Sequence, residues 1–526
     1  MLLFGVLSAQ SWGPVVNLSN TANNCSISCH GTQHNIDAVG DVVHVLWAEN
    51  NRTDYYSGGS VVYRRSTDFG TTWGSIITLM TVTDPPDPPP HGDTIFELGM
   101  GPNHTSLCAN GNYVHAIWDI DSVWTYYINL GGGDTDTVER HHYWIYYARS
   151  TNAGVNWSSP VLLHGVDSVG SAPAIAASGN NVYAIWLDDY DHDQWMDITL
   201  RRSTDNGATW GSETRVYEAG DVLPVMWPDI AASGNYVHVI FLKWKLTSID
   251  KMYARSTNAG SSWSTSTLFT SSNTLISFYG YPSIEAAGDY VYAAWDDAYY
   301  IRVKRSTDNG ATWIPSGSDQ ALTIDSAMAH GGGWSVSPSI ACDPTGQYVH
   351  VFWWFRNSTF NGEILYQFSG NYGASWSFPA LNASGNTRYW SILPSTAARD
   401  TCACVTWSDM DLLVSDADMF YRRVCMPKPL YEGAPEATGA LTGLSLIAVP
   451  HKGRFEVLFS VPREGFVSLA LYDPSGRLVK EAFKDEAPAG YHRATVSTAG
   501  LPDGIYYLVL STSSGTVTAK APVGVK

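Results

Sequence analysis

The sequence predicts an all-β protein in two parts, a large ring of repeated four-stranded sheets followed by a small β-sandwich. Three observations support this fold class. Aromatic residues make up 13% of the 526 residues and glycines number 47, which suits strands and turns. An eight-residue motif recurs six times. Residues 1–440 carry 21 basic and 42 acidic side chains whereas residues 441–526 carry 9 and 7, so two domains of different character are expected.

The chain begins with an apolar stretch, residues 1–9, that ends in small residues. It resembles the second half of a secretory signal peptide, although the basic start is missing, and a first strand is the alternative. We expect no membrane span, because no run of about 18 apolar residues occurs. The formal charge of −19 also argues against nucleic-acid partners, whose phosphates need a basic surface.

The repeated motif reads Ser-Thr-Asp-Phe-Gly-Thr-Thr-Trp at residues 66–73, and every copy ends in tryptophan. We expect the Asp or Asn at its third position to accept hydrogen bonds from backbone N–H groups two residues on. The glycine permits positive φ, and the tryptophan packs on the sheet. Each copy is therefore a hairpin turn between two strands, with a structural Asp or Asn at Asp68, Asn152, Asp205, Asn258, Asp308 and Asn371.

Counting the strands gives seven repeats, because an aromatic residue ends the second strand seven times, at Trp47, Trp118, Trp186, Phe241, Trp295, Trp353 and Trp407. Repeated four-stranded sheets closed into a circle form a β-propeller. The sequence therefore predicts a seven-bladed propeller over residues 10–425, with six blades as the alternative because the motifs number six. The last repeat lacks the motif, so residues 12–18 are expected to supply its outer strand by pairing with residues 418–424.

The motif Ser-x-Asp-x-Gly-x-x-Trp resembles the Asp box of the sialidase (neuraminidase) superfamily and of other BNR-repeat propellers. The resemblance covers residues 10–425 and implies a propeller whose boxes lie on the face opposite the active site. A sialidase would use three arginines to hold one carboxylate, a tyrosine nucleophile activated by glutamate, and an aspartate acid/base. The Arg-Ile-Pro signature of the family is absent from this chain.

Residues 426–443 have the composition of a linker, and residues 444–526 read as a compact all-β module of immunoglobulin-like type. The order Phe-Ser-Val-Pro, Leu-Tyr-Asp-Pro-Ser-Gly and Gly-Ile-Tyr-Tyr-Leu resembles the C-terminal sorting domain of type IX secretion cargo. This resemblance implies a Gram-negative bacterium of the Bacteroidetes kind, contact with the type IX secretion machinery, and release or anchoring at the cell surface. The alternative is an ordinary immunoglobulin-like binding module.

Candidate functional side chains lie in the loops opposite the boxes, which are long and rich in acids and aromatics. The second residue after the strand-2 aromatic is acidic in four repeats, at Glu49, Asp188, Asp297 and Asp409. These acids could cap turns, bind Ca²⁺, or act in catalysis. In the catalytic interpretation Asp188 and Asp297 are the candidate acid and base. Arg356, Arg388 and Tyr389 are then the candidate substrate contacts.

Six arginines occupy one position in six repeats and are therefore expected to be structural: Arg65, Arg149, Arg202, Arg255, Arg305 and Arg423. The remaining arginines and the loop aromatics suit a sugar, whose C–H faces stack on rings and whose hydroxyls need polar partners. The predicted ligand contacts are Arg52, Arg140, Trp227, Tyr281, Trp334 and Trp390. The chain is thus expected to bind glycans. The alternatives are an exo-acting, sialidase-like glycoside hydrolase or a protein-binding surface propeller.

The seven cysteines allow several pairings. Cys25 and Cys29, with His30 and His34 nearby, could be metal ligands or could form a local disulfide. One disulfide is expected among Cys402, Cys404 and Cys425, whose strands should pair. Cys108 and Cys342 are expected to be buried thiols.

Overall fold

A computed structural model describes most of the chain. The described residues are 11–19, 24–27, 34–51, 58–82, 95–131, 134–165, 170–188, 196–220, 225–271, 281–297, 299–318, 321–326, 333–357, 362–377, 380–385, 390–411, 416–426, 445–451, 454–461, 465–487, 490–513 and 515–523. The chain divides into two compact parts, residues 1–428 and 429–526. Both are built from strands, and the described residues contain no helix that could span a membrane.

The N-terminal part contains seven four-stranded antiparallel repeats, and five of them are separate sheets. Their strands, with those of repeats 1 and 7, are as follows. Repeat 1 comprises β4 (Ile36–Val39), β5 (Val42–Asn51), β6 (Gly59–Ser66) and β7 (Ile77–Val82); repeat 2 comprises β8 (Ile95–Asn110), β9 (Tyr113–Gly131), β10 (Asp134–Ser150) and β11 (Val161–His164). Repeat 3 comprises β12 (Ser171–Ser178), β13 (Asn181–Asp188), β14 (Asp197–Ser203) and β15 (Thr214–Tyr217); repeat 4 comprises β16 (Val225–Ser233), β17 (Tyr236–Trp244), β18 (Ile249–Ser256) and β19 (Ser264–Ser271). Repeat 5 comprises β20 (Ser283–Ala287), β21 (Tyr290–Asp297), β22 (Tyr300–Ser306) and β23 (Leu322–Ser326); repeat 6 comprises β24 (Gly333–Cys342), β25 (Val349–Asn357), β26 (Gly362–Ser369) and β27 (Leu381–Asn382). Repeat 7 comprises β28 (Trp390–Arg399), β29 (Cys402–Asp411), β30 (Asp416–Cys425) and the N-terminal β1 (Ser11–Trp12) and β2 (Val16–Asn17).

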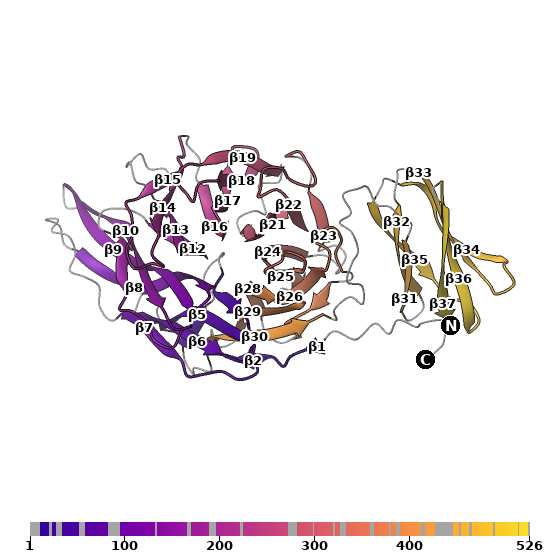
Figure 1. Ribbon diagram of the computed structural model, residues 1–526, viewed down its shortest axis with the longest axis horizontal. Coiled ribbons are helices and arrows are strands. Elements are labelled where there is room, and N and C mark those ends of the chain that lie inside the picture. The colour runs from indigo at the N-terminus through magenta and orange to yellow at the C-terminus, as the bar shows by residue number, and fades with distance from the viewer. Residues whose placement is uncertain are drawn as a thin grey trace. The chain divides into compact units, whose positions relative to one another are not determined.

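The repeats follow one another around a common centre, as Figure 1 shows. The first strand of each repeat contacts the first strand of the next, and β28 of repeat 7 returns to β4 of repeat 1. This circular order is consistent with a β-propeller. The large buried side chains confirm the repeat pattern, because the tryptophans that end the second strands are fully buried.

The N-terminal segment closes the ring by pairing with the last strand, as predicted. Trp12 lies opposite Val424, and Val16 lies opposite Tyr421. One further strand, β3 (Asn24–Ile27), was not expected; it pairs with both β30 and β5 and so joins repeats 7 and 1 into a ten-stranded sheet. Both ends of the propeller chain are therefore held in one sheet, with no open edge at the junction.

Within each box the serine and the Asp or Asn divide the hydrogen bonds differently from the sequence prediction. The Ser66 hydroxyl accepts from the Gly70 N–H at 2.8 Å, whereas Asp68 accepts from the Thr72 N–H at 2.7 Å, four residues on rather than two. The Thr72 hydroxyl donates to the other Asp68 oxygen. In the Asn boxes the polarity reverses, because the amide of Asn258 donates to the Ser262 hydroxyl at 2.8 Å.

Each box also binds the preceding repeat, which the sequence prediction of a local turn did not include. The fourth box residue has positive φ in all six copies, between 52° and 59°, and its carbonyl accepts a hydrogen bond from the repeated arginine of the neighbouring repeat. The pairs are Arg65 with Ala153, Arg149 with Asn206, Arg202 with Ala259, Arg255 with Asn309, Arg305 with Tyr372, and Arg423 with Phe69. The six arginines are thus structural links between repeats.

Aromatic packing reinforces the same joints. The box tryptophan of one repeat packs edge-on against a tyrosine of the preceding repeat, with Trp157 4.8 Å from Tyr63 and Trp210 4.9 Å from Tyr147 between ring centroids. The box glycine leaves room for the tyrosine hydroxyl, since a Cβ on Gly154 would lie 1.8 Å from the Tyr63 oxygen. Glycine is therefore required there for space as well as for positive φ.

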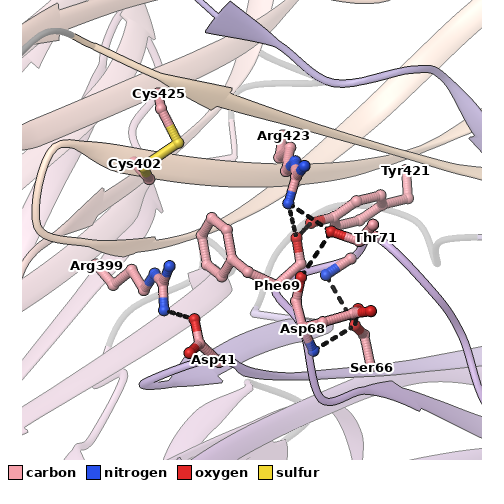
Figure 2. Close-up of polar contacts among 11 residues, drawn as sticks. Asp41, Ser66, Asp68, Phe69, Thr71, Arg399, Cys402, Tyr421, Arg423 and Cys425 are labelled. Atoms are coloured by element: carbon pink, nitrogen blue, oxygen red, sulfur yellow. Dashed lines mark hydrogen bonds and ion pairs between the residues drawn. A yellow bond between two sulfur atoms is a disulfide. The ribbon is translucent and has the colours of Figure 1, made fainter.

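The closing joint between repeats 7 and 1 uses the same contacts, as Figure 2 shows. Arg423 donates to the Phe69 carbonyl and to the Thr71 hydroxyl, and Trp73 packs 4.8 Å from Tyr421. Arg399 forms an ion pair with Asp41. The two ends of the ring are thus joined by side chains as well as by strand pairing.

The seventh repeat has no complete box, and two features replace it. Trp12 packs edge-on against Tyr366 of repeat 6 at 5.7 Å, and the Gly13 N–H donates to the Arg423 carbonyl, as the Gly74 N–H does to Arg65 after the first box. A disulfide joins Cys402 to Cys425 across β29 and β30, which confirms the disulfide expected in this region. Cys404 and Cys108 are buried thiols and Cys342 is half-buried. Of the other two cysteines, Cys25 lies on β3, and Cys29 is outside the described residues, as is His30.

The C-terminal part is a two-sheet structure. One sheet contains β31 (Ser445–His451), β32 (Arg454–Val461) and β35 (Gly490–Ser497); the other contains β33 (Gly465–Tyr472), β34 (Leu478–Ala487), β36 (Gly504–Thr512) and β37 (Gly515–Val523). Side chains of both sheets share one buried core that includes Phe455, Val457, Leu469 and Leu508. The two sheets therefore pack face to face as a sandwich.

We predict that Asp68→Ala lowers the melting temperature of the propeller by a few degrees, whereas Asp68→Asn is tolerated at pH 7. The asparagine boxes show that an amide can serve both bonds with its donor reversed. The box hydrogen bonds lower the pKa of Asp68 to about 2, so its contribution is present above pH 4 and is lost as the pH falls towards 2. Thermal unfolding of both variants from pH 2 to pH 7 tests this; equal stability of Ala and Asn variants would contradict it.

We predict that Arg255→Ala destabilises the propeller by about 1 to 2 kcal/mol, because the Asn309 carbonyl loses its charged donor. The same substitution at Arg477, whose side chain is 82% exposed in the C-terminal part, is the control and should leave the propeller transition unchanged. Urea unfolding followed by tryptophan fluorescence measures both. An unchanged midpoint for the Arg255 variant would mean that the joint does not depend on this link.

Candidate ligand-binding face

The six boxes lie at one end of the propeller, which we call the box end. The turns between first and second strands lie there too, since the Ala153 N–H of a box donates to the Asn112 carbonyl of such a turn. Because the strands are antiparallel, the second strands finish at the opposite end, which we call the loop end. The predicted ligand contacts and acids belong to the loop end.

Three of the predicted ligand contacts come together at the loop end of repeats 6 and 7. Trp334 on β24 lies opposite Arg356 on β25, and Trp390 begins β28. The Arg356 guanidinium carbon is 5.0 Å from the Trp334 ring centroid and 5.3 Å from that of Trp390. Trp354 packs edge-on against Trp390 at 5.8 Å. A cation is thus held between two half-buried indoles, which fixes the plane of the guanidinium.

Local sequence explains how this cluster forms. Trp390 follows a loop and enters the first strand of repeat 7, and a Cβ on Gly362 would lie 2.3 Å from its ring. The glycine that begins β26 therefore makes room for the indole. The Trp390 indole nitrogen is buried and has no hydrogen-bond partner among the described residues. An indole N–H in that state is a donor without an acceptor.

A second aromatic cluster joins repeats 2, 4 and 5. Trp227 packs edge-on against Tyr281 at 4.6 Å and lies 6.1 Å from the His104 ring. Trp227 has positive φ at an irregularity in the pairing of β16, where the register shifts between Met226 and Asp229. Such a bulge turns the strand locally and costs backbone strain, which is common next to functional sites.

His104 is bound to an aspartate that the sequence analysis did not select. Its Nδ1 lies 2.7 Å from the Asp119 carboxylate, and both side chains are buried. Asp119 directly follows Trp118, one position before the acids that were selected in other repeats. The alternation of a strand would place it on the other sheet face, and only the structure shows that His104 and the Ala172 N–H reach it.

The candidate acid Asp297 is engaged in an ion pair. Its carboxylate accepts from the Ser271 hydroxyl at 2.6 Å and lies 3.2 Å from Nη2 of Arg302. The candidate acid Asp188 is fully buried in repeat 3, with its oxygen 3.4 Å from Nε2 of His164. Repeat 4 lies between these two acids, and neither carboxylate contacts the other among the described residues.

The other selected acids are also held locally. Glu49 accepts from the Trp47 indole at 3.2 Å, and Asp409 accepts from the Ser391 hydroxyl at 3.3 Å. The only group of three His, Cys, Asp or Glu side chains that could meet at one ion, within the part of the chain that is described, is His164, Asp188 and Glu213. A shared calcium site of the four acids is therefore not supported by the described geometry.

Several predicted residues cannot be placed. Arg52, Arg388 and Tyr389 lie outside the described residues. Arg140 lies on β10, of which only the backbone is described at that position. His34, considered with Cys25 as a possible metal ligand, lies 3.5 Å from Asp229.

The structure identifies Asp296 and Lys251 as a buried pair that the sequence analysis missed. Both side chains are fully buried, and neither the Asp296 oxygens nor the Lys251 nitrogen has a hydrogen-bond partner among the described residues. Burial raises the pKa of Asp296 to about 6, with Lys251 opposing the rise, and burial lowers the pKa of Lys251. Carboxyl groups with a pKa near neutrality are typical of proton-transferring sites. The two residues come from different repeats, so no local motif marks them.

Comparison with family models finds no match, and comparison with curated protein sequences finds none either. Several solved structures are similar in fold. A phage phi92 endosialidase matches at 12% identity over 96% of this chain and 88% of its own, with a TM-score of 0.42. The polysaccharide lyase Uly1 matches at 10% identity over 78% of this chain and 94% of its own, with a TM-score of 0.44. A mutant of Trypanosoma rangeli sialidase displaying trans-sialidase activity matches at 10% identity over 98% and 90%, with a TM-score of 0.38. Likeness at this level assigns no activity to the chain.

We predict that Asp296→Asn changes how stability depends on pH. Because the folded carboxyl has a pKa of about 6 against 3.8 ordinarily, the unfolded chain ionises first, and the wild-type protein loses stability as the pH rises from 4 to 6. The size of this effect is on the order of 3 kcal/mol. The melting temperature of the variant relative to wild type should therefore rise across this range. Asp289→Asn, at an exposed turn of the same repeat, is the control; a pH-independent difference for Asp296→Asn would contradict the prediction.

Proposed function

We propose that this chain is a secreted or cell-surface β-propeller of the sialidase-like type, with seven blades, that binds glycans at its loop end. The observation that carries the proposal is the Trp334, Arg356 and Trp390 cluster. Three residues selected from sequence as ligand contacts lie together there, on three strands of two repeats.

The chemistry of the cluster suits a sugar. Indole faces stack on the C–H faces of pyranose rings, and a guanidinium donates hydrogen bonds to hydroxyls and pairs with carboxylates. The second cluster, Trp227 with Tyr281, adds another aromatic surface at the same end. Two such clusters in different repeats favour a ligand longer than a single sugar unit.

Exo-acting glycoside hydrolysis is the second candidate, and Asp296 favours it. A general acid needs a raised pKa, and burial raises that of Asp296 to about 6. Cleavage also needs a second carboxylate at a suitable distance, and Asp297 beside it is paired with Arg302. Binding is therefore the better-supported function.

The address of the protein is also a proposal. The sandwich of residues 445–523 and its sequence resemblance support an immunoglobulin-like sorting domain recognised by type IX secretion machinery. The apolar residues 1–9 support export by a signal peptide.

We predict that the purified protein binds glycans on an array and that Trp390→Ala weakens this binding about five- to tenfold, because one aromatic stacking contact is worth on the order of 1 kcal/mol. Hydrolysis of a fluorogenic sialoside should be absent or feeble. Trp263→Ala is the matched control; it removes a box tryptophan, so it should lower the melting temperature and leave affinity unchanged.

Efficient turnover of the sialoside would reject the binding function in favour of hydrolysis, and Asp296→Asn would then be the first variant to assay. Absence of both binding and hydrolysis, with and without Ca²⁺, would favour a protein partner instead. Equal loss of binding in the Trp390 and Trp263 variants would mean that the loop end is not the binding surface.

We predict that deletion of residues 441–526 leaves a folded propeller that accumulates in the periplasm of a host with type IX secretion. The reason is that the two parts are separate compact structures with separate cores. Cell fractionation with an antibody to the propeller measures this. Normal appearance of the truncated protein at the cell surface would refute the proposed address.

A further inference from the structure

Three side chains from two repeats converge at one point that the glycan-binding proposal does not use. His164 ends β11 of repeat 2, Asp188 ends β13 of repeat 3, and Glu213 immediately precedes β15. One donor atom from each residue lies within 4.8 Å of those of the others. His164 Nε2 is 3.4 Å from Asp188, and His164 Nδ1 is 3.2 Å from Glu213.

Asp188 is the residue that most needs a partner. Its side chain has no exposed surface, and neither carboxylate oxygen makes a hydrogen bond. A buried carboxylate without hydrogen bonds is costly unless a positive charge lies against it. The nearest charged group is the His164 ring at 3.4 Å, which Glu213 also approaches.

We propose that His164, Asp188 and Glu213 bind a divalent transition-metal ion of the zinc or manganese class. One neutral imidazole and two carboxylates balance a charge of +2, and this donor set suits those ions. Ligand atoms around a four-coordinate ion with bonds of 2.0 to 2.1 Å lie about 3.3 Å apart. The N···O separations of 3.2 and 3.4 Å match that spacing.

The surroundings hold the three ligands in place. A Cβ on Gly170 would lie 2.5 Å from the His164 ring, so a glycine is needed for the ring to occupy its position. Arg201 lies 3.6 Å from Glu213 and donates to the Leu163 carbonyl, which fixes the guanidinium beside one ligand. The Trp186 ring lies 5.3 Å from that of His164 and shields it. The ion would thus tie repeat 2 to repeat 3.

The test uses the full-length protein freed of metal with a chelator. Isothermal titration with Zn²⁺ and with Mn²⁺, and Ca²⁺ for comparison, should show one transition-metal site per chain, and the bound ion should raise the melting temperature. His164→Ala and Asp188→Asn should each weaken binding at least about tenfold. Glu213→Gln, at a partly exposed ligand, should weaken binding while keeping the fold if either of the other variants unfolds.

The matched control is the double variant Cys25→Ser with Cys29→Ser, which removes the other candidate metal ligands of the chain and should leave the affinity unchanged. Co²⁺ in place of Zn²⁺ should give visible absorption that disappears in His164→Ala. Failure of the wild-type protein to bind Zn²⁺ or Mn²⁺ would overturn the proposal and leave an imidazolium that bridges two carboxylates. Binding that survives in all three ligand variants, or that is lost in the cysteine variant, would also overturn it.

Discussion

The structure depends on one repeated joint, in which an arginine on the third strand of a repeat donates to a backbone carbonyl in the Asp box of the next. The carbonyl is available because the box residue has positive φ, and the following glycine leaves space for a tyrosine of the preceding repeat. The box tryptophan then packs on that tyrosine. The box is therefore a contact between repeats as well as a turn within one, and closure of the ring follows from repeating it.

The exception to this joint is informative. Between repeats 6 and 7 the arginine position is Phe368 and the box is missing, so neither partner of the link exists. At this joint the N-terminal segment supplies Trp12, Arg422 donates to the Ala383 carbonyl, and a disulfide joins the two strands of repeat 7 at the box end. The chain thus completes its last repeat with residues from its first, and the two ends of the propeller stabilise each other.

Because the box end is occupied by these joints, the loop end is available for function. The loops there are not constrained by the repeated contacts, and their sequences differ from repeat to repeat. The Trp334, Arg356 and Trp390 cluster, the Trp227 and Tyr281 pair, and the buried Asp296 and Lys251 each occur in one place only. Side chains that break the repeat pattern while remaining buried or stacked are the ones that a fold requirement does not explain.

The sequence alone determined the repeat, the strand order within it, the return of the N-terminus to the last strand, the structural role of the six arginines, and a disulfide near Cys402 and Cys425. These follow from local periodicity and from residues at fixed spacing. Tertiary structure decided which side chains meet across repeats: that Arg356 stacks between two indoles, that Asp297 is paired whereas Asp296 is not, and that His164 reaches Asp188 and Glu213. Such contacts join residues tens of positions apart, and burial, which sets their charge and pKa, is a property of the packed ring rather than of any segment.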